Sequence, residues 1–294
     1  MTAVAERPGV KELVIPGHMS YSQANTLSTC SYQWYLGRGR RVPEQPNWGS
    51  VGGSAVHDVT EQYDKALWAG NPLTDETLTD VFHDTLDEQI AEREHFSKFD
   101  RSEFHVGGRA SKQWPNKENE DWWRENGVAM VKSWKAWRQV CPWELAEVPD
   151  PETGELVPAI EVGMEVDLGE GPIKAFIDRV FTYQGNLVVL DLKTNAREPE
   201  SAKQLDLYAV MYEKLFGAKP ATGVFWMGRT GATGSLYPLN ASAEQFSYEF
   251  DAARRIIEAR AFIPKVSSLC RGCGVREYCY AVGGKYAAEV IPWA

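Results

Sequence analysis

The sequence predicts an α/β fold of the α+β type, in which a central mixed sheet is flanked by helices and preceded by a helical region. Three observations predict it. Apolar residues recur at helical spacing as far as about residue 140, strict apolar–polar alternation begins near residue 158, and a helical segment separates the later strands. The chain has 294 residues, of which 43% are hydrophobic and 24% are charged, as in ordinary globular proteins.

We expect one domain over residues 20–294 that follows a leader at residues 1–19. Within it we expect a helical region at 20–145, an α/β core at 155–262 and a cysteine-bearing segment at 263–294. No apolar run approaches the roughly 20 residues that a membrane span needs. The N-terminus lacks the apolar core of a secretory signal. The expected location is therefore the cytoplasm, with no membrane contact.

Four helices are expected in the first half, because apolar residues there recur every three or four positions. They are a helix from Ser20 or Ser22 toward Cys30, a helix opened by Gly52-Gly53, a helix over about 74–95, and an aromatic-rich helix from about Trp122 to just before Pro142. Residues 96–117 combine paired glycines with a proline and mixed charge, which predicts a loop.

Strands are expected where the period changes to two. They lie at about 158–167, 173–183, 187–193, 221–228 and 234–239, with helices at about 199–216 and 242–261. The sequence Gln184-Gly185-Asn186 predicts a hairpin turn between the second and third strands.

Two acids and a lysine stand on the neighbouring second and third strands. Asp178 lies in one, and Asp191 ends the apolar run of the next. Strand pairing can bring the two carboxylates together, where they repel each other unless a divalent cation lies between them. Lys193 projects to the same face as Asp191 because it is two residues further along the strand. The three residues predict a Mg²⁺- or Mn²⁺-dependent hydrolytic site, although a surface Asp–Lys pair is also common.

Three further polar residues suit such a site. His57 follows a glycine pair on an apolar helix face, where it is either a core residue or a metal ligand. Gln204 and Tyr208 are one helical turn apart, so they share a face of the helix after Lys193. We expect Gln204 to hold Lys193 or a DNA phosphate, and the Tyr208 hydroxyl to contact backbone.

These motifs in this order resemble the RecB-type PD-(D/E)xK nucleases. The resemblance covers residues from about Ser20 to Tyr280, with Ala175 at a position where many members have glycine. It implies a restriction-endonuclease-like core whose metal ligands are His57, Asp178, Asp191 and the backbone carbonyl of Leu192, and whose catalytic residues are Asp178, Asp191, Lys193, Gln204 and Tyr208. An acid on the first strand, Glu161 or Glu165, could assist.

Three of the five cysteines cluster near the C-terminus as Cys270, Cys273 and Cys279, a spacing that indicates a metal or cluster site. The resemblance to iron–sulfur AddB-type and CRISPR-adaptation exonucleases implies Cys30 as a distant fourth ligand. Four thiolates could bind either Zn²⁺ or a [4Fe–4S] cluster, and the resemblance favours the cluster. It would act as a structural staple between the N- and C-terminal segments. Cys141 is expected to be a buried bystander.

The formal net charge of −10 argues against a protein that coats DNA tightly, since this requires many basic phosphate contacts. Residues 1–48 and 251–294 are nevertheless basic, at +2 and +3, which leaves −15 for the middle segment. A narrow basic path for DNA is therefore compatible with the composition. Its candidate residues are Arg38, Arg40, Arg41, Arg271 and Arg276.

The leading hypothesis is a divalent-metal-dependent DNA exonuclease that acts on single strands or free ends, in phage or bacterial recombination or repair. The alternative is a non-catalytic DNA-binding or adaptor protein with a structural four-cysteine zinc or iron–sulfur site. A third hypothesis is a nuclease that works only with a helicase, recombinase or integrase as its partner. The presence of every acid and of Lys193 favours the enzyme.

Overall fold

The computed structural model describes residues 12–291, apart from residues 109–111, 114, 116 and 170. The α-helices are α1 (Tyr21–Trp34), α2 (Trp48–Trp68), α3 (Asp75–Ser97), α4 (Glu120–Val140), α5 (Lys203–Phe216) and α6 (Ala243–Glu258). The short helical segments are η1 (Tyr35–Gly39), η2 (Arg101–Glu103), η3 (Ser268–Gly272), η4 (Arg276–Tyr278), η5 (Tyr280–Val282) and η6 (Ala287–Glu289). In the part of the chain that the structure describes, no helix is long and apolar enough to cross a membrane.

The strands form a curled six-stranded mixed sheet and a separate two-stranded ribbon. They are β1 (Glu144–Leu145), β2 (Glu147–Pro149), β3 (Leu156–Pro158), β4 (Ile160–Asp167), β5 (Pro172–Tyr183), β6 (Asn186–Lys193), β7 (Thr222–Met227) and β8 (Ala232–Pro238). The order is β1-β5-β6-β7-β8, with β4 also paired to β5, and β2 pairs with β3. Of the named strands in the described residues, β6 and β7 pair in parallel, because α5 makes the crossover between them.

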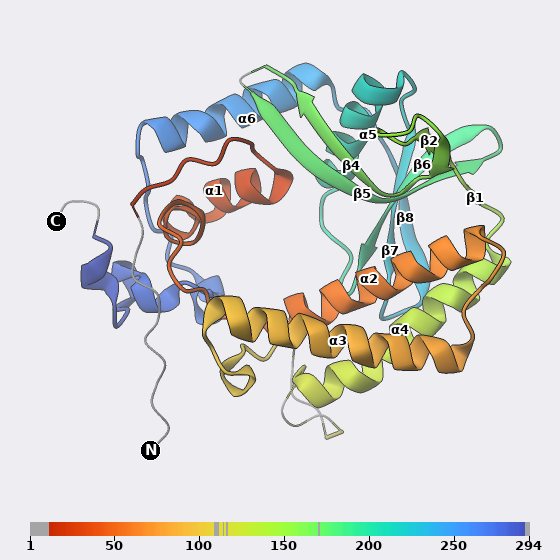
Figure 1. Cartoon of the computed structure of the whole chain (residues 1–294). Helices are drawn as coiled ribbons and strands as arrows, with labels where there is room; N and C mark the ends of the chain where they lie inside the picture. Colours follow the sequence, from red (N-terminus) through yellow and green to blue (C-terminus); the bar gives the residue numbers. More distant parts are fainter. Residues whose placement is uncertain (1–11, 109–111, 114, 116, 170, 292–294) are drawn as a thin grey trace.

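Two hydrophobic cores lie on opposite sides of this sheet. One joins α1, α5 and α6 to β4 and β5, and the other joins α2, α3 and α4 to β6 and β7. Figure 1 shows α1 and α6 beside the long strands β4 and β5, and the three helices α2, α3 and α4 stacked on the other side. This confirms the predicted mixed sheet flanked by helices.

The strand β5 changes its partner at the residues that carry the site. Its first part pairs with β4 as far as Arg179, and its second part pairs with β6 from Arg179 onward. Asp178 therefore lies where the ladder passes from one neighbour to the other. At this point a side chain can reach groups on β4, β6 and α2.

Several boundaries differ from the predicted ones. Gly52 and Gly53 lie inside α2 and not at its start, because Asn47 caps the helix with its side chain 2.7 Å from the Ser50 amide. Helix α5 begins at Lys203 and not near 199, where Pro199 and a bend precede it. The short strands β1, β2 and β3 were not predicted, since two or three residues are too few to show a period.

The N-terminal part of the predicted leader, residues 1–11, lies outside the described residues. The rest of it is bonded to the fold. The Val14 amide donates to the Gly39 carbonyl at 2.9 Å, and the Met19 amide donates to the Pro172 carbonyl at 3.0 Å. Met19 is buried. The segment before α1 therefore extends the edge of the sheet beside the start of β5.

Candidate active site

Three side chains from three elements meet where β5 changes its partner. Asp178 lies on β5, Glu161 on β4 and His57 on α2. The Nδ1 atom of His57 is 3.5 Å from Oδ2 of Asp178, and one ligand atom from each of the three residues lies within 4.8 Å of the others. An imidazole nitrogen and carboxylate oxygens at this separation form a donor set for Mg²⁺ or Mn²⁺.

Glu161 joins the group through strand register. The β4–β5 ladder pairs Ile160 with Arg179 and Val162 with Ile177, so Glu161 lies between these pairs at the level of Asp178. Its backbone has a φ of 48°, a left-handed conformation that costs a non-glycine residue free energy and clusters at functional sites. The sequence had offered Glu161 and Glu165 as equivalent candidates. Glu165 instead forms an ion pair with Lys174 at 2.9 Å.

The second predicted acid is joined to the lysine and to α5 by one chain of contacts. The Nζ atom of Lys193 is 2.5 Å from Oδ2 of Asp191 and donates to Oε1 of Gln204 at 3.1 Å. The Nε2 atom of Gln204 donates to the Tyr208 hydroxyl at 2.6 Å. Because the glutamine and the tyrosine are one turn apart on α5, the helix holds the lysine ammonium at the end of β6.

A backbone hydrogen bond links the two halves of the site. The Leu192 amide donates to Oδ2 of Asp178 at 2.6 Å, the oxygen that also faces His57. The carboxylate of Asp178 is thereby fixed between α2 and β6. The metal contact predicted for Leu192 concerns its carbonyl and stays a prediction.

The buried carboxylates of this site repel one another, whereas His57 and Asp178 attract each other. Burial and the Asp178 carboxylate raise the pKa of Asp191 to about 6, although the neighbouring lysine opposes the rise. Burial and Asp178 raise the pKa of Glu161 to about 7. Burial disfavours the imidazolium of His57, but the attraction of Asp178 outweighs it and raises the pKa of His57 to about 9. Burial also opposes ionisation of Asp178, but His57 overcomes it, so the pKa of Asp178 is lowered.

A divalent cation fits this arrangement. The buried Oδ2 atom of Asp191 touches Lys193 as an ion pair but accepts no hydrogen bond of suitable geometry. The ammonium of Lys193 balances the charge of this buried oxygen, and a carboxylate oxygen can accept more than one partner. His57, Glu161 and Asp178 offer one nitrogen donor and two carboxylates whose ligand atoms lie within 4.8 Å of one another, a set that suits a divalent cation, whereas Asp191 is not part of this group of three.

The glycine pair of α2 brings this helix close to the site. A Cβ atom at Gly52 would overlap the indole ring of Trp123 on α4. A Cβ atom at Gly53 would lie 3.1 Å from Oγ1 of Thr194, which follows β6. Helix α2 therefore packs closely against both neighbours, and this places His57, one turn later, against β5.

A buried ionic network behind the site was missed in the sequence. The carboxylate of Asp64, on α2, accepts hydrogen bonds from Nε of Arg179 at 2.6 Å and from Nε of Arg138 at 2.9 Å. A guanidinium nitrogen of Arg179 also donates to the Asp178 carbonyl at 2.6 Å and contacts Glu161 at 3.4 Å. Arg179 is thus the link that holds the backbone of one metal-site acid and the side chain of another.

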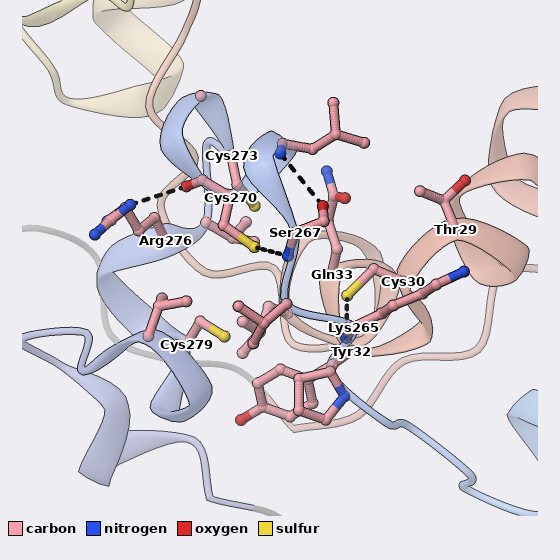
Figure 2. A pocket seen from close by; sticks show the side chains of 17 residues that line it. Thr29, Cys30, Tyr32, Gln33, Lys265, Ser267, Cys270, Cys273, Arg276 and Cys279 are labelled. Carbon is pink, nitrogen blue, oxygen red and sulfur yellow. Dashed lines mark hydrogen bonds between the residues drawn. The ribbon is translucent and has the colours of Figure 1, made fainter.

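The four cysteines predicted as cluster ligands line one cavity of about 290 Å³, shown in Figure 2. The α1 helix is interrupted at Cys30, which has a φ of −157° and a ψ of 95°. The backbone amides of Lys265 and Ser267 donate to the sulfur atoms of Cys30 and Cys270, both at 3.4 Å. Among the described residues, three metal-ligand side chains meet within 4.8 Å only at His57, so a closed four-cysteine cluster is not formed.

The predicted DNA-contact arginines lie in the two segments that border this cavity. Arg38, Arg41 and Arg271 are exposed, and Arg40 is half-buried with its guanidinium donating to the Tyr35 hydroxyl at 2.7 Å. Arg276 is exposed, lines the cavity and donates to the Cys270 carbonyl at 3.2 Å. Contact of these arginines with DNA stays a prediction.

Comparison with known proteins places the chain in a family. It is 27% identical over 282 residues to the Gene 69 protein of Mycobacterium phage D29, covering 88% of this chain and 95% of that protein. It is 26% identical over 285 residues to the Gene 69 protein of Mycobacterium phage L5, with the same coverage.

A crystal structure of a candidate exonuclease from Eubacterium rectale matches 87% of both chains with 11% identity and a TM-score of 0.44, which is too low to carry an argument. The sequence pattern of the PD-(D/E)XK nuclease superfamily, by contrast, matches residues 18–280, which include every residue of the site described above. This chain belongs to the PD-(D/E)XK nuclease superfamily.

Proposed function

We propose that this protein is a divalent-metal-dependent deoxyribonuclease that removes nucleotides from single-stranded DNA or from free DNA ends. One observation carries the proposal. The donor group of His57, Glu161 and Asp178 lies beside the Asp191–Lys193 pair, in a chain that matches the superfamily over residues 18–280. If Asp191 and Lys193 were only a surface ion pair, there would be no reason for the metal-ligand side chains of His57, Glu161 and Asp178 to lie beside them.

The cation would be held by His57, Glu161 and Asp178, with Asp191 and the Leu192 carbonyl as the further ligands that the resemblance implies. When bound, Mg²⁺ or Mn²⁺ supplies a Lewis acid that polarises the phosphodiester and makes water more acidic. The residues of the chain hold the metal ligands in place. The imidazole, fixed by α2, faces the carboxylate that the Leu192 amide fixes from β6.

Lys193 has two roles that follow from its contacts. Its ammonium is available to orient the attacking water and to stabilise negative charge on the phosphoryl oxygens during in-line displacement. Oε1 of Gln204 accepts a hydrogen bond from the ammonium, and the Tyr208 hydroxyl in turn accepts one from Nε2 of Gln204. This chain restricts the lysine to one rotamer, so that it is placed before the substrate binds.

The preference for single strands or ends follows from the resemblance, and the acidic net charge disfavours extended contact with any DNA backbone. The relatives from two mycobacteriophages support phage or bacterial DNA processing as its setting. The exposed arginines at 38, 41, 271 and 276 are the proposed contacts with the DNA backbone.

We also propose that Cys30, Cys270, Cys273 and Cys279 hold a structural [4Fe–4S] cluster. They line one cavity. Burial is the main cause that raises the pKa of Cys279, and the nearby thiols of Cys30 and Cys270 raise it further. Backbone amides that donate to two of the sulfurs are typical of iron–sulfur sites. Zn²⁺ would need sulfur atoms about 3.8 Å apart in a tetrahedron with bonds of about 2.3 Å. Among the described residues no three of these sulfurs lie within 4.8 Å of one another, a wider spacing that favours the larger cluster.

A nuclease assay tests the enzymatic proposal. We expect labelled single-stranded DNA to be degraded in Mn²⁺ by the wild type and not by Asp191→Asn, because this substitution keeps the shape and removes one metal ligand. Asp251→Asn removes an acid on α6 that pairs with Arg255, and it is the matched control. Circular single-stranded DNA should resist an exonuclease.

Equal activity of wild type and Asp191→Asn would refute the proposed site. DNA binding without cleavage by the wild type would favour the adaptor hypothesis, and cleavage that requires an added helicase, recombinase or integrase would favour the partner-dependent one. Metal analysis with an absorption spectrum tests the cluster. Iron and sulfide in equal amounts are expected, whereas stoichiometric zinc would replace the iron–sulfur proposal.

A further inference from the structure

One large apolar side chain beside the proposed metal site is left exposed. Phe176 is 61% exposed although it stands in the middle of β5, where its neighbours Ala175 and Ile177 are buried. A single exposed apolar residue is common on soluble proteins and needs no explanation by itself. This one has a particular position. It is two residues before Asp178, so both side chains project from the same face of the strand, about 6.8 Å apart along it.

The residue opposite Phe176 leaves space for its ring. Gly163 pairs with Phe176 in the β4–β5 ladder, and a Cβ atom at Gly163 would lie 3.2 Å from Cε1 of the ring. The phenyl group therefore rests over the backbone of β4, where other residue types would displace it. Its exposed fraction leaves the remaining ring surface to solvent.

Charge along the same face does not repel a nucleic acid. The register row beyond Phe176 holds Glu165 and Lys174, which neutralise each other in an ion pair at 2.9 Å. The row before it holds Glu161 and Asp178, the acids of the proposed metal site. The face thus runs from a cation site to an aromatic ring and then to a neutral pair.

We propose that Phe176 is a stacking platform for one nucleobase of a single strand whose neighbouring phosphate lies at the metal site. The inference rests on the proposed nuclease function and names its substrate as unpaired DNA. Aromatic side chains bind every base through its π-face, which suits an enzyme without sequence preference. Bases inside a duplex are stacked on both faces and offer none to the ring.

The test measures the binding of fluorescent single-stranded oligonucleotides in Ca²⁺, with Phe176→Ala, Phe176→Trp and Phe96→Ala. Phe96 is a matched control, because it is 71% exposed and lies at the end of α3. We expect Phe176→Ala to weaken binding about tenfold, within the range for loss of one base–aromatic stack. The tryptophan should retain wild-type affinity, and Phe96→Ala should be neutral.

Oligonucleotides with one abasic position locate the contact. At one position near the cleaved bond, removal of the base should weaken wild-type binding about tenfold and leave Phe176→Ala unaffected. Binding of a blunt duplex should be the same for both proteins. The platform is refuted if Phe176→Ala binds the intact single strand as tightly as the wild type, or if every abasic oligonucleotide discriminates the two proteins equally.

The proposed function and this inference fail in different ways. Absence of Mn²⁺-dependent cleavage by the wild type, or its persistence in Asp191→Asn, would remove the function whatever the binding result. Cleavage with unchanged binding by Phe176→Ala would remove only the platform. A rise in melting temperature on addition of Mn²⁺ should be the same for Phe176→Ala and the wild type, which shows that the variant is folded with its metal site intact.

Discussion

The buried carboxylate of Asp64 supports the site through its hydrogen bonds with Arg179 and Arg138. We expect the negative charge of Asp64 to be essential for this support. The substitution Asp64→Asn keeps the shape of the side chain but leaves Arg179 and Arg138 without their anion. Both guanidinium groups are almost fully buried, with side-chain exposures of 2% and 7%. The change therefore isolates the charge of the network, because it creates no cavity.

Removing one partner of a buried ion pair costs about 3–5 kcal/mol, since the other charge stays buried without compensation. We expect the lower end, about 3 kcal/mol, because the asparagine oxygen can still accept one hydrogen bond. For a large domain each kcal/mol lowers the melting temperature by about 2–4 °C. The melting temperature of Asp64→Asn should thus fall by about 6–12 °C.

Thermal unfolding followed by circular dichroism measures this difference. Asp75→Asn is the control, because Asp75 also pairs with a basic residue of α4, Lys135, but its side chain is 65% exposed. Its melting temperature should change little. Arg179 also holds Glu161, so Asp64→Asn should in addition reduce the stabilisation by Mn²⁺. A melting temperature of Asp64→Asn that matches Asp75→Asn would refute this account of the network.

Three further predictions concern other parts of the molecule. The pKa values of Asp191 (about 6) and His57 (about 9) are raised, so without metal the folded protein binds more protons than the unfolded chain. The stability of the metal-free protein should therefore fall as the pH rises from about 4 to 6, because of Asp191, and from about 6.5 to 9, because of His57. Melting curves should show that Mn²⁺ raises the melting temperature more at pH 8.5 than at pH 6. Gly52→Ala should lower the melting temperature or the soluble yield, since the new methyl group overlaps Trp123. Cys30→Ala should lose the brown colour of the cluster and much of the thermal stability, because a cross-link from Cys30 to the C-terminal segment is worth roughly 5 kcal/mol in the chain-entropy model.

The sequence predicted the helices and strands whose apolar pattern continues over a long segment. The strand β4 and the helices α3, α4 and α6 were found within a few residues because their apolar residues recur at a fixed spacing, and β6 was found because its apolar run is continuous. Asp191 and Lys193 were found because they stand at the end of an apolar strand, and Asp178 because it lies in the neighbouring strand. The chain of contacts from Lys193 through Gln204 to Tyr208 follows from helical spacing after β6.

The missed features depend on contacts between distant segments. Glu161 could not be chosen over Glu165 without the β4–β5 register, which depends on where the turn between the strands begins. Asp64 lies seven residues after His57 and therefore on nearly the same face of α2. This spacing is visible in the sequence, but any polar residue on the buried face of a helix would show it. Its meaning depends on Arg138 and Arg179, which are 74 and 115 residues away.

The site is assembled from elements that belong to both hydrophobic cores, and this has an energetic consequence. His57 comes from α2, which packs in one core, whereas β4 and the Gln204–Tyr208 face of α5 pack in the other. A cation that binds His57, Glu161 and Asp178 would therefore connect α2 to the β4–β5 hairpin. The unfolded chain does not hold these ligands together, so it does not bind the cation. A free cation concentration of one hundred times Kd would therefore add about 2.7 kcal/mol to the free energy of unfolding. We expect this gain to disappear in His57→Ala and in Glu161→Gln alike, although the two residues come from elements that pack in different cores.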